Sequence, residues 1–113
     1  MAHRVEIRKN KAGEFVEPTL EAASAAAAGA EIKDDLTYSA IWADGAESYP
    51  ITAQTWIIAY KVQTDQAKAD ALKAFLTYIL TDGQEIAGEV NYAPLPEELA
   101  AKALAQLDAF EIG

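Results

Sequence analysis

Few residues of this 113-residue chain have a type and spacing that could do chemistry. His3 is the only histidine, and it lies in Met-Ala-His, residues 1–3, which are typical of an artificial expression start. The chain has no cysteine, which excludes disulfides, thiolate catalysis and cysteine metal sites. No nucleophile lies beside a base in a known pattern, and no glycine-rich phosphate cradle is present. We therefore expect no catalytic residue and no enzyme activity.

Two acidic pairs invite a metal or an acid/base interpretation. Asp34 and Asp35 are adjacent, so their carboxylates point in different directions, and no third ligand follows at a suitable spacing. We interpret them as part of a solvated loop. Glu97 and Glu98 match the preference of acidic residues for the first turn of a helix. The sequence therefore predicts no metal site and no cofactor.

The stretch "SYPITAQTWIIAYK", residues 48–61, combines the composition of a buried strand with a polar end. Thr52, Gln54 and Thr55 cluster at that end. Such side chains either satisfy nearby backbone groups or line a binding cleft. We favour the first for Thr52 and Thr55, and keep Thr52 and Gln54 as candidate cleft-lining residues. For Trp56, as for Trp42, burial is favoured over stacking on a ligand.

The elements that must position these residues alternate between strands and helices. Residues 51–61 give the strongest strand signal, and residues 65–80 give the strongest helix signal. The helix carries an apolar stripe formed by Leu72, Phe75, Leu76, Ile79 and Leu80. The other expected elements are a strand at 4–8 continued by 15–16, a helix from Pro18-Thr19 to Gly29, a loop with one short strand in 31–49, a break at Asp82-Gly83, a short helix with Ile86, Ala87 and Val90, and a last helix from Pro96.

This order predicts one domain over residues 1–113, of α/β (α+β) class. We expect a small mixed sheet packed with helices. In the last helix, one face should carry Leu99, Ala103, Leu104 and Leu107.

Charge and hydropathy restrict the partners. The formal net charge is −9, so nucleic acid and anionic membranes are poor candidates. Residues 1–12 are basic, whereas the remainder is strongly acidic. No apolar run approaches the roughly 20 residues that span a bilayer. No signal peptide is recognisable at the start, so we expect the chain as written to remain cytoplasmic.

Four segments carry a family resemblance through their order and spacing. They are "NKAGEFVEPT" at 10–19 with the alanine run after it, "YPITAQTWIIAYK" at 49–61, "LTDGQEIAGEVNYAPLP" at 80–96, and the helix that follows. From about Val5 to Phe110, the chain resembles the C-terminal third of the periplasmic phosphate-binding protein of the ABC phosphate transporter. No single segment is decisive, because "YAPLP" alone would be a weak signal.

The resemblance implies a two-lobed α/β protein that binds one phosphate between its lobes, and it makes this chain part of one lobe. In the family, main-chain N–H groups, hydroxyls, an arginine and an aspartate hold the phosphate. Those contacts come from glycine- and serine-rich loops that this chain lacks, and Arg4 and Arg8 are its only arginines. We therefore assign no phosphate-binding residue. The full-length family members are periplasmic or lie at the outer cell surface, and they deliver phosphate to a membrane permease.

Two interpretations remain open. The chain is a piece of a phosphate-binding protein without phosphate affinity of its own, or it is a recruited or engineered stand-alone structural domain that self-associates. A homodimer is expected because the predicted sheet has too few strands to be stable alone. Edge pairing, or exchange of the Arg4–Arg8 strand between copies, could supply the missing partner.

Overall fold

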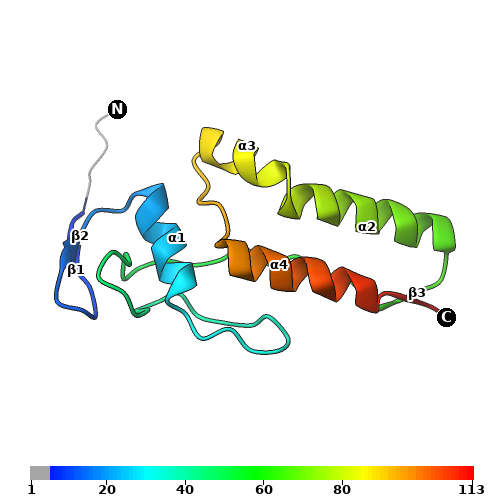
Figure 1. Cartoon of the computed structure of the whole chain (residues 1–113), viewed down its shortest axis with the longest axis horizontal. Helices are drawn as coiled ribbons and strands as arrows, with labels where there is room; N and C mark the ends of the chain where they lie inside the picture. The colour runs from blue at the N-terminus through cyan, green and yellow to red at the C-terminus, as the bar shows by residue number, and fades with distance from the viewer. Residues whose placement is uncertain (1–5) are drawn as a thin grey trace.

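A computed structural model describes residues 6–113 of the chain (Figure 1). The predicted strand at 4–8 falls partly outside this range, as do His3 and the Met-Ala-His start. The elements are β1 (Arg8–Lys9), β2 (Phe15–Val16), α1 (Leu20–Ala28), β3 (Val62–Gln63), α2 (Gln66–Leu80), α3 (Gly83–Glu89), α4 (Glu97–Gln106), the 3-10 turn η1 (Leu107–Ala109) and β4 (Glu111–Ile112).

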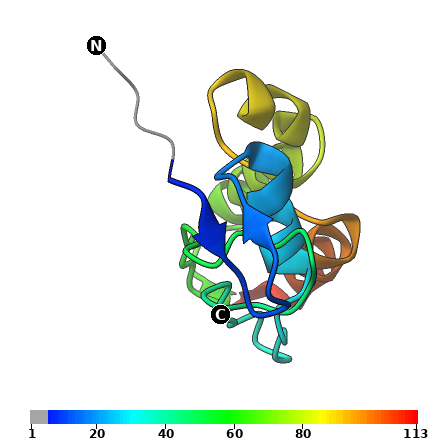
Figure 2. The same cartoon turned by 90° about the vertical axis from the view of Figure 1, so that its left-hand side faces the viewer.

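The first two strands form a short antiparallel hairpin at one end of the molecule (Figure 2). Arg8 lies opposite Val16, and Lys9 lies opposite Phe15. The turn between them contains Gly13 at a φ of 91°, a conformation that glycine adopts without the steric cost of a side chain. A strand at 15–16 is confirmed, but it pairs back on β1 instead of continuing it. Of the predicted strand at 4–8, Glu6 and Ile7 are not in a strand and Arg8 is.

Helix α1 ends at Gly29 as predicted, and it begins at Leu20, so that Pro18 precedes the helix and is not part of its first turn. The Thr19 Oγ1 accepts a hydrogen bond from the Ala22 N–H (3.1 Å), which caps the first turn. At the other end, the Gly29 N–H donates to the Ala25 carbonyl (2.9 Å). A Cβ atom at Gly29 would lie 1.9 Å from the Asp44 carbonyl oxygen, so only glycine lets the following loop approach this closely.

The loop after α1 packs on the helix through small side chains. Ala26 of α1 forms a buried cluster with Ala40 and Ala43 of the loop, and Tyr38 packs against this cluster. The Tyr49 N–H donates to the Ala22 carbonyl (3.1 Å), which fixes the end of the loop on the helix. Alanine faces therefore bring loop and helix into close contact, as the alanine-rich run suggests.

The strands predicted in 31–49 and at 51–61 are wrong for this structure. Residues 31–61 are loop, and the next strand is β3. Ile58 and Tyr60, expected to be buried, are 93% and 86% exposed. A strand forms only where a neighbouring strand takes up its backbone hydrogen bonds, and within residues 6–113 no strand lies beside this segment. Strand propensity without a partner leaves an extended loop.

The C-terminal part is helical, with α2 and α4 side by side and antiparallel (Figure 1). The Asp65 Oδ1 caps α2 by accepting from the Lys68 N–H (2.9 Å). The predicted break falls between α2 and α3, and Pro96 precedes the last helix as expected. Leu76, Leu99 and Leu107 are the buried leucines of this part.

Two predictions about the core differ from the structure: the burial of Phe75 in the apolar stripe of α2, and the single sheet. Phe75 is 60% exposed rather than buried. Instead of one small sheet, the described residues form two separate two-stranded sheets, the hairpin and a parallel pair of β3 with β4. In the parallel pair, Val62 lies opposite Glu111, and Gln63 lies opposite Ile112. The mixed α/β class is confirmed, whereas the single-sheet core is wrong.

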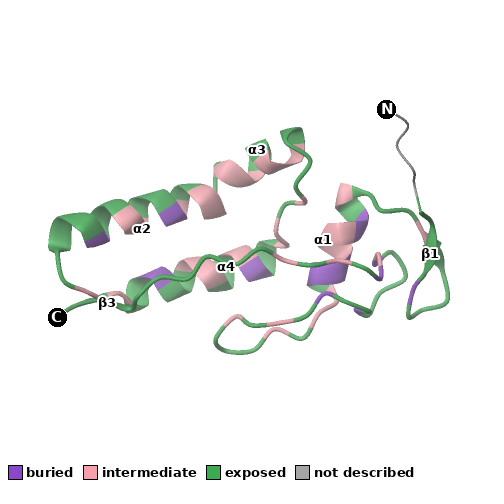
Figure 3. Cartoon of the chain, turned by 180° about the vertical axis from the view of Figure 1, so that it is seen from behind, coloured by how far each residue is buried: buried purple, intermediate pink, exposed green. Residues whose placement is uncertain are grey.

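The molecule is extended for its length. Its radius of gyration is 16.3 Å, whereas a compact chain of this size has about 13 Å. Figure 3 shows buried residues as isolated bands on α1, α2, α4 and the loop, with exposed surface between them. Among residues 6–113, the buried apolar residues are six alanines, three leucines and Pro50, while many large apolar side chains lie in solvent. This arrangement buries little of the chain's apolar surface.

Candidate functional site

The two candidate cleft-lining residues make local hydrogen bonds to backbone. The Thr52 Oγ1 donates to the Tyr49 carbonyl (2.8 Å). The Gln54 Nε2 donates to the Tyr38 carbonyl, which ties residues 52–54 to the preceding loop. Both side chains are half-buried. The expectation that Thr52 satisfies a nearby backbone group is confirmed, and a cleft-lining role stays a prediction.

Neither tryptophan is buried, in contrast to the sequence prediction. Trp56 is 45% exposed, and its ring meets Tyr38 at a centroid distance of 5.6 Å with an interplanar angle of 60°. Desolvation by this packing raises the pKa of Tyr38. Trp42 is also exposed, and its backbone N–H donates to the Pro50 carbonyl (2.9 Å). The two rings therefore lack the enclosed surroundings of a ligand-stacking pair.

The structure places a buried polar cluster around Asn10 and Ser48, which are 2% and 0% exposed. The Asn10 Nδ2 donates to the carbonyls of Gly45 (3.2 Å), Ala46 (2.8 Å) and Ser48 (3.1 Å). The Asn10 Oδ1 accepts from the Glu14 N–H (3.0 Å). One side chain thus joins the hairpin turn to the loop on α1.

Every polar group of this cluster finds a partner. The Ser48 Oγ donates to the Asp44 carbonyl (2.7 Å). Among the described residues, no buried side-chain nitrogen or oxygen lacks a hydrogen-bond partner. A saturated cluster holds structure together and leaves nothing directed at a ligand. Sequence reasoning missed it because an asparagine before a turn is common, and its partners lie 35–38 residues away.

A shallow depression of about 500 Å³ lies where the hairpin meets α1. Its lining includes four carboxylates, those of Glu14, Glu17, Glu21 and Glu47, together with the exposed ring of Phe15. No basic side chain lines it. An anion would be repelled from such a surface, because like charges in a partly desolvated site oppose binding.

Three of the described basic residues, Arg8, Lys9 and Lys11, lie in the hairpin, and the others are spread along the chain. Within residues 6–113, five basic side chains pair with carboxylates. The pairs are Arg8–Glu6, Lys11–Asp44, Lys61–Glu111, Lys73–Asp108 and Lys102–Glu98.

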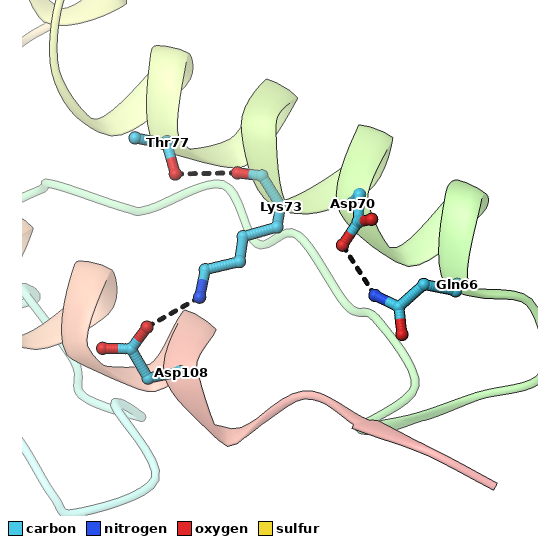
Figure 4. Close-up of polar contacts among 5 residues, drawn as sticks. All are labelled: Gln66, Asp70, Lys73, Thr77 and Asp108. Carbon is cyan, nitrogen blue, oxygen red and sulfur yellow. Dashed lines mark hydrogen bonds and ion pairs between the residues drawn. The ribbon is translucent and has the colours of Figure 1, made fainter.

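The Lys73 pair shows what these contacts do. Its Nζ reaches from α2 to the Asp108 Oδ1 (2.7 Å), so it joins two elements (Figure 4). Beside it on α2, the Gln66 Nε2 donates to the Asp70 Oδ1 (2.8 Å), and the Thr77 Oγ1 donates to the Lys73 carbonyl (2.7 Å). These polar groups hydrogen-bond to one another and to the helix backbone. The three donors point to three different acceptors, so they do not form a shared anion-binding site.

The described residues contain no group of three or more His, Cys, Asp or Glu side chains that could hold a metal ion. The Asp35 Oδ1 accepts from the Thr37 hydroxyl (2.6 Å) and from the Thr37 N–H (3.0 Å), and these bonds lower the pKa of Asp35. Asp34 and Asp35 are exposed, as the solvated-loop interpretation predicts. Across residues 6–113, no helix is long and apolar enough to span a membrane.

Comparison with known proteins supplies the decisive likeness. No family model matches the chain. The phosphate-binding protein PstS of Pasteurella multocida (strain Pm70) is 35% identical over 100 residues, which cover 87% of this chain and 29% of that protein. PstS of Xylella fastidiosa (strain 9a5c) is 33% identical over 93 residues (80% and 26%), and PstS of Methanocaldococcus jannaschii is 34% identical over 106 residues (81% and 27%).

This chain is similar to a segment of PstS. The match confirms the family resemblance that the four ordered sequence segments predict. It covers most of this chain but only 26–29% of these three PstS proteins.

Proposed function

We propose that this chain is a segment of the phosphate-binding protein of an ABC phosphate transporter, one part of a lobe, and that it has no phosphate affinity by itself. The observation that carries the proposal is the partial match to PstS, 30–35% identical and spanning 26–29% of each relative. A binding site built from several parts of a chain is incomplete when most of those parts lie elsewhere.

The chemistry of phosphate supports the second half of the proposal. A dehydrated anion needs several convergent donors to replace the water it loses. Five of the described cations pair with carboxylates, and the depression between hairpin and α1 is acidic. The formal net charge of −9 adds a general repulsion.

The partners of the whole protein follow from the same proposal. Phosphate and the membrane permease of the transporter are partners of the full-length protein, which works outside the cytoplasmic membrane. A solute-binding protein moves its ligand without changing it, so we propose no enzyme activity. Nucleic acid remains an unfavourable partner because of the acidic charge.

Isothermal titration with inorganic phosphate at low ionic strength tests the proposal. We expect no saturable heat at micromolar to millimolar phosphate. The PstS protein of Pasteurella multocida, titrated in the same buffer, is the positive control, and sulfate is the control for unspecific anion binding. A phosphate-specific site with unit stoichiometry and micromolar affinity in this chain would refute the proposal.

The alternative is a stand-alone structural domain that self-associates as a homodimer. The observation that favours it is the number of large apolar side chains in solvent, including Ile58, Tyr60 and Phe75. Apolar surface of this extent is unusual on a monomer. The two proposals are compatible, because one concerns origin and the other present behaviour. Solution mass by light scattering decides whether the chain associates.

A further inference from the structure

Residues 48–60, which we call the neutral segment, form the longest uncharged stretch on an acidic molecule. These thirteen residues contain no Asp, Glu, Lys or Arg, whereas the whole chain has a formal net charge of −9. The segment passes behind α4 in Figure 1 and crosses in front of it in Figure 3, where it is coloured mostly as exposed. It therefore lies on the surface with one side open to solvent.

Large apolar side chains of the neutral segment lie in water. Ile51, Trp56, Ile57, Ile58 and Tyr60 are between 45% and 93% exposed. Taking about 200 Å² for an aromatic side chain, Trp56 and Tyr60 alone leave roughly 260 Å² uncovered, and the three isoleucines add to it. A stable interface buries about 800 Å² on each partner. One segment thus provides a substantial share of the area that a dimer needs.

The backbone of the neutral segment is available as well. Within residues 6–113, no backbone N–H of residues 51–60 donates to another backbone group. The segment is rich in β-branched and aromatic residues, which fit a pleated strand. Unpaired strand edges of this composition pair readily with a second strand. Pairing would satisfy the backbone and cover side chains in one step.

The charge distribution favours a second copy of this chain as the occupant. Two acidic molecules repel each other over most of their surfaces, but two neutral segments meet without opposing like charges. A two-fold axis near Trp56 makes the pairing antiparallel, so that Thr52 of one copy faces Tyr60 of the other. Lys61 adds no repulsion at the end of the segment, because it is paired with Glu111 (2.9 Å).

We propose that two copies associate by antiparallel pairing of their neutral segments around Trp56. The pairing rests on the proposed self-association and not on the proposed lack of phosphate affinity. An experiment can therefore refute one of these proposals and leave the other standing. The paired segments form a two-stranded ribbon with α4 behind each strand. The occupant is a second copy, and the exposed side of α2 around Phe75 stays outside the interface.

Two matched variants test the position of the interface. Light scattering and sedimentation over a dilution series should give a reversible dimer for the unaltered chain. Ile58→Lys should raise the dissociation constant at least tenfold, because it removes the most exposed apolar side chain and adds two charges to the ribbon. Phe75→Lys changes an exposed apolar residue on α2 and should change the dissociation constant of the dimer less than twofold. A monomer at millimolar concentration, or a larger effect of Phe75→Lys, would overturn the proposal.

The absence of cysteine allows a direct test of the register. Single cysteines are introduced as Thr55→Cys, Trp56→Cys and Ile57→Cys, with Ala71→Cys on the exposed side of α2 as the control. A residue on the two-fold axis faces its own copy at about 4.5–5.5 Å between Cα atoms, which suits a disulfide. Mild oxidation should cross-link one of the three at least fivefold more than the control. Equal yields at all four positions would contradict the pairing.

Discussion

Two neighbouring stretches, on either side of Pro50, have opposite fates. Residues 40–49 belong to a stretch predicted as a loop with one short strand, and they are held closely against α1 and the hairpin turn. Residues 51–60 look like the best strand of the chain, and they lie in solvent. The difference is where each stretch finds its partners. Alanine packing and side-chain-to-backbone bonds are supplied by elements that the structure contains, whereas a strand needs a second strand beside it.

The largest expected effect is on the packed side of this comparison. Gly29→Ala places a Cβ atom 1.9 Å from the Asp44 carbonyl oxygen, which is backbone and cannot turn away. We expect the free energy of unfolding to fall by about 3 kcal/mol, the upper range for overpacking. Chemical denaturation followed by circular dichroism measures it. Gly88→Ala in α3 is the matched control, because nothing lies within 4 Å of its Cβ position and alanine favours a helix by about 0.5–1 kcal/mol over glycine. An equal loss there would show that the close approach to Asp44 is not the cause.

Asn10→Ala tests whether hydrogen bonds hold the packed stretch. It removes the donor to three loop carbonyls and leaves buried acceptors unsatisfied. We expect a loss of about 2 kcal/mol in the free energy of unfolding. Gln66→Ala removes an exposed side-chain bond to Asp70 and should change stability by less than about 0.5 kcal/mol. Similar losses for both variants would mean that burial of the cluster contributes nothing.

Trp56→Ala tests the exposed side. A buried tryptophan would cost about 3–5 kcal/mol on truncation, whereas the observed half-exposed ring has one aromatic contact, with Tyr38. We expect a loss of about 1 kcal/mol. The pKa of Tyr38 should also fall back toward its ordinary value as the desolvation is relieved. Ultraviolet titration of the tyrosines and denaturation of the monomer measure both, and a loss above about 3 kcal/mol would place Trp56 in a core.

The smallest effect lies in the loop before the packed stretch. The hydroxyl and the N–H of Thr37 stabilise the charged form of Asp35 and lower its pKa. A lowered pKa contributes stability above the unfolded-state value, and that contribution disappears as the pH falls through the folded-state value. Thr37→Val removes the hydroxyl, so the Asp35 pKa should rise. NMR titration of the Asp35 carboxyl measures it, and an unchanged midpoint would show that the hydrogen bond does not form in solution.

Local signals predicted most of what is local in this fold. The start of α1 near Thr19, its end at Gly29, the start of α2 near Asp65 and the break before α3 are predicted correctly, because each depends on neighbouring residues. The strand at 51–61 is wrong because its partner is not determined by its own residues. The prediction that Phe75 is buried is wrong for the same reason, because within residues 6–113 no other element covers this part of the apolar stripe.

The features of the candidate site also differ in whether they depend on nearby or on distant residues. The absence of a catalytic motif and the ordered family segments are readable from residue types. The Asn10 cluster depends on partners 35–38 residues away and was not predictable. The hydrogen bond of Thr52 to the Tyr49 carbonyl was predictable in kind, because hydroxyls at a turn commonly bind nearby backbone.

Amide hydrogen exchange of the dilute monomer tests the central contrast most directly. The backbone N–H of Asn10 donates to the Glu14 carbonyl (2.8 Å), and the backbone N–H of Tyr49 donates to the Ala22 carbonyl (3.1 Å). Both should therefore be protected from exchange, as should the backbone amides of α2. The amides of residues 53–60 should exchange at rates close to those of an unfolded chain. If residues 53–60 of the monomer were protected as strongly as α2, the segment would have a partner within its own chain, and residues 51–60 would not be an unpaired strand.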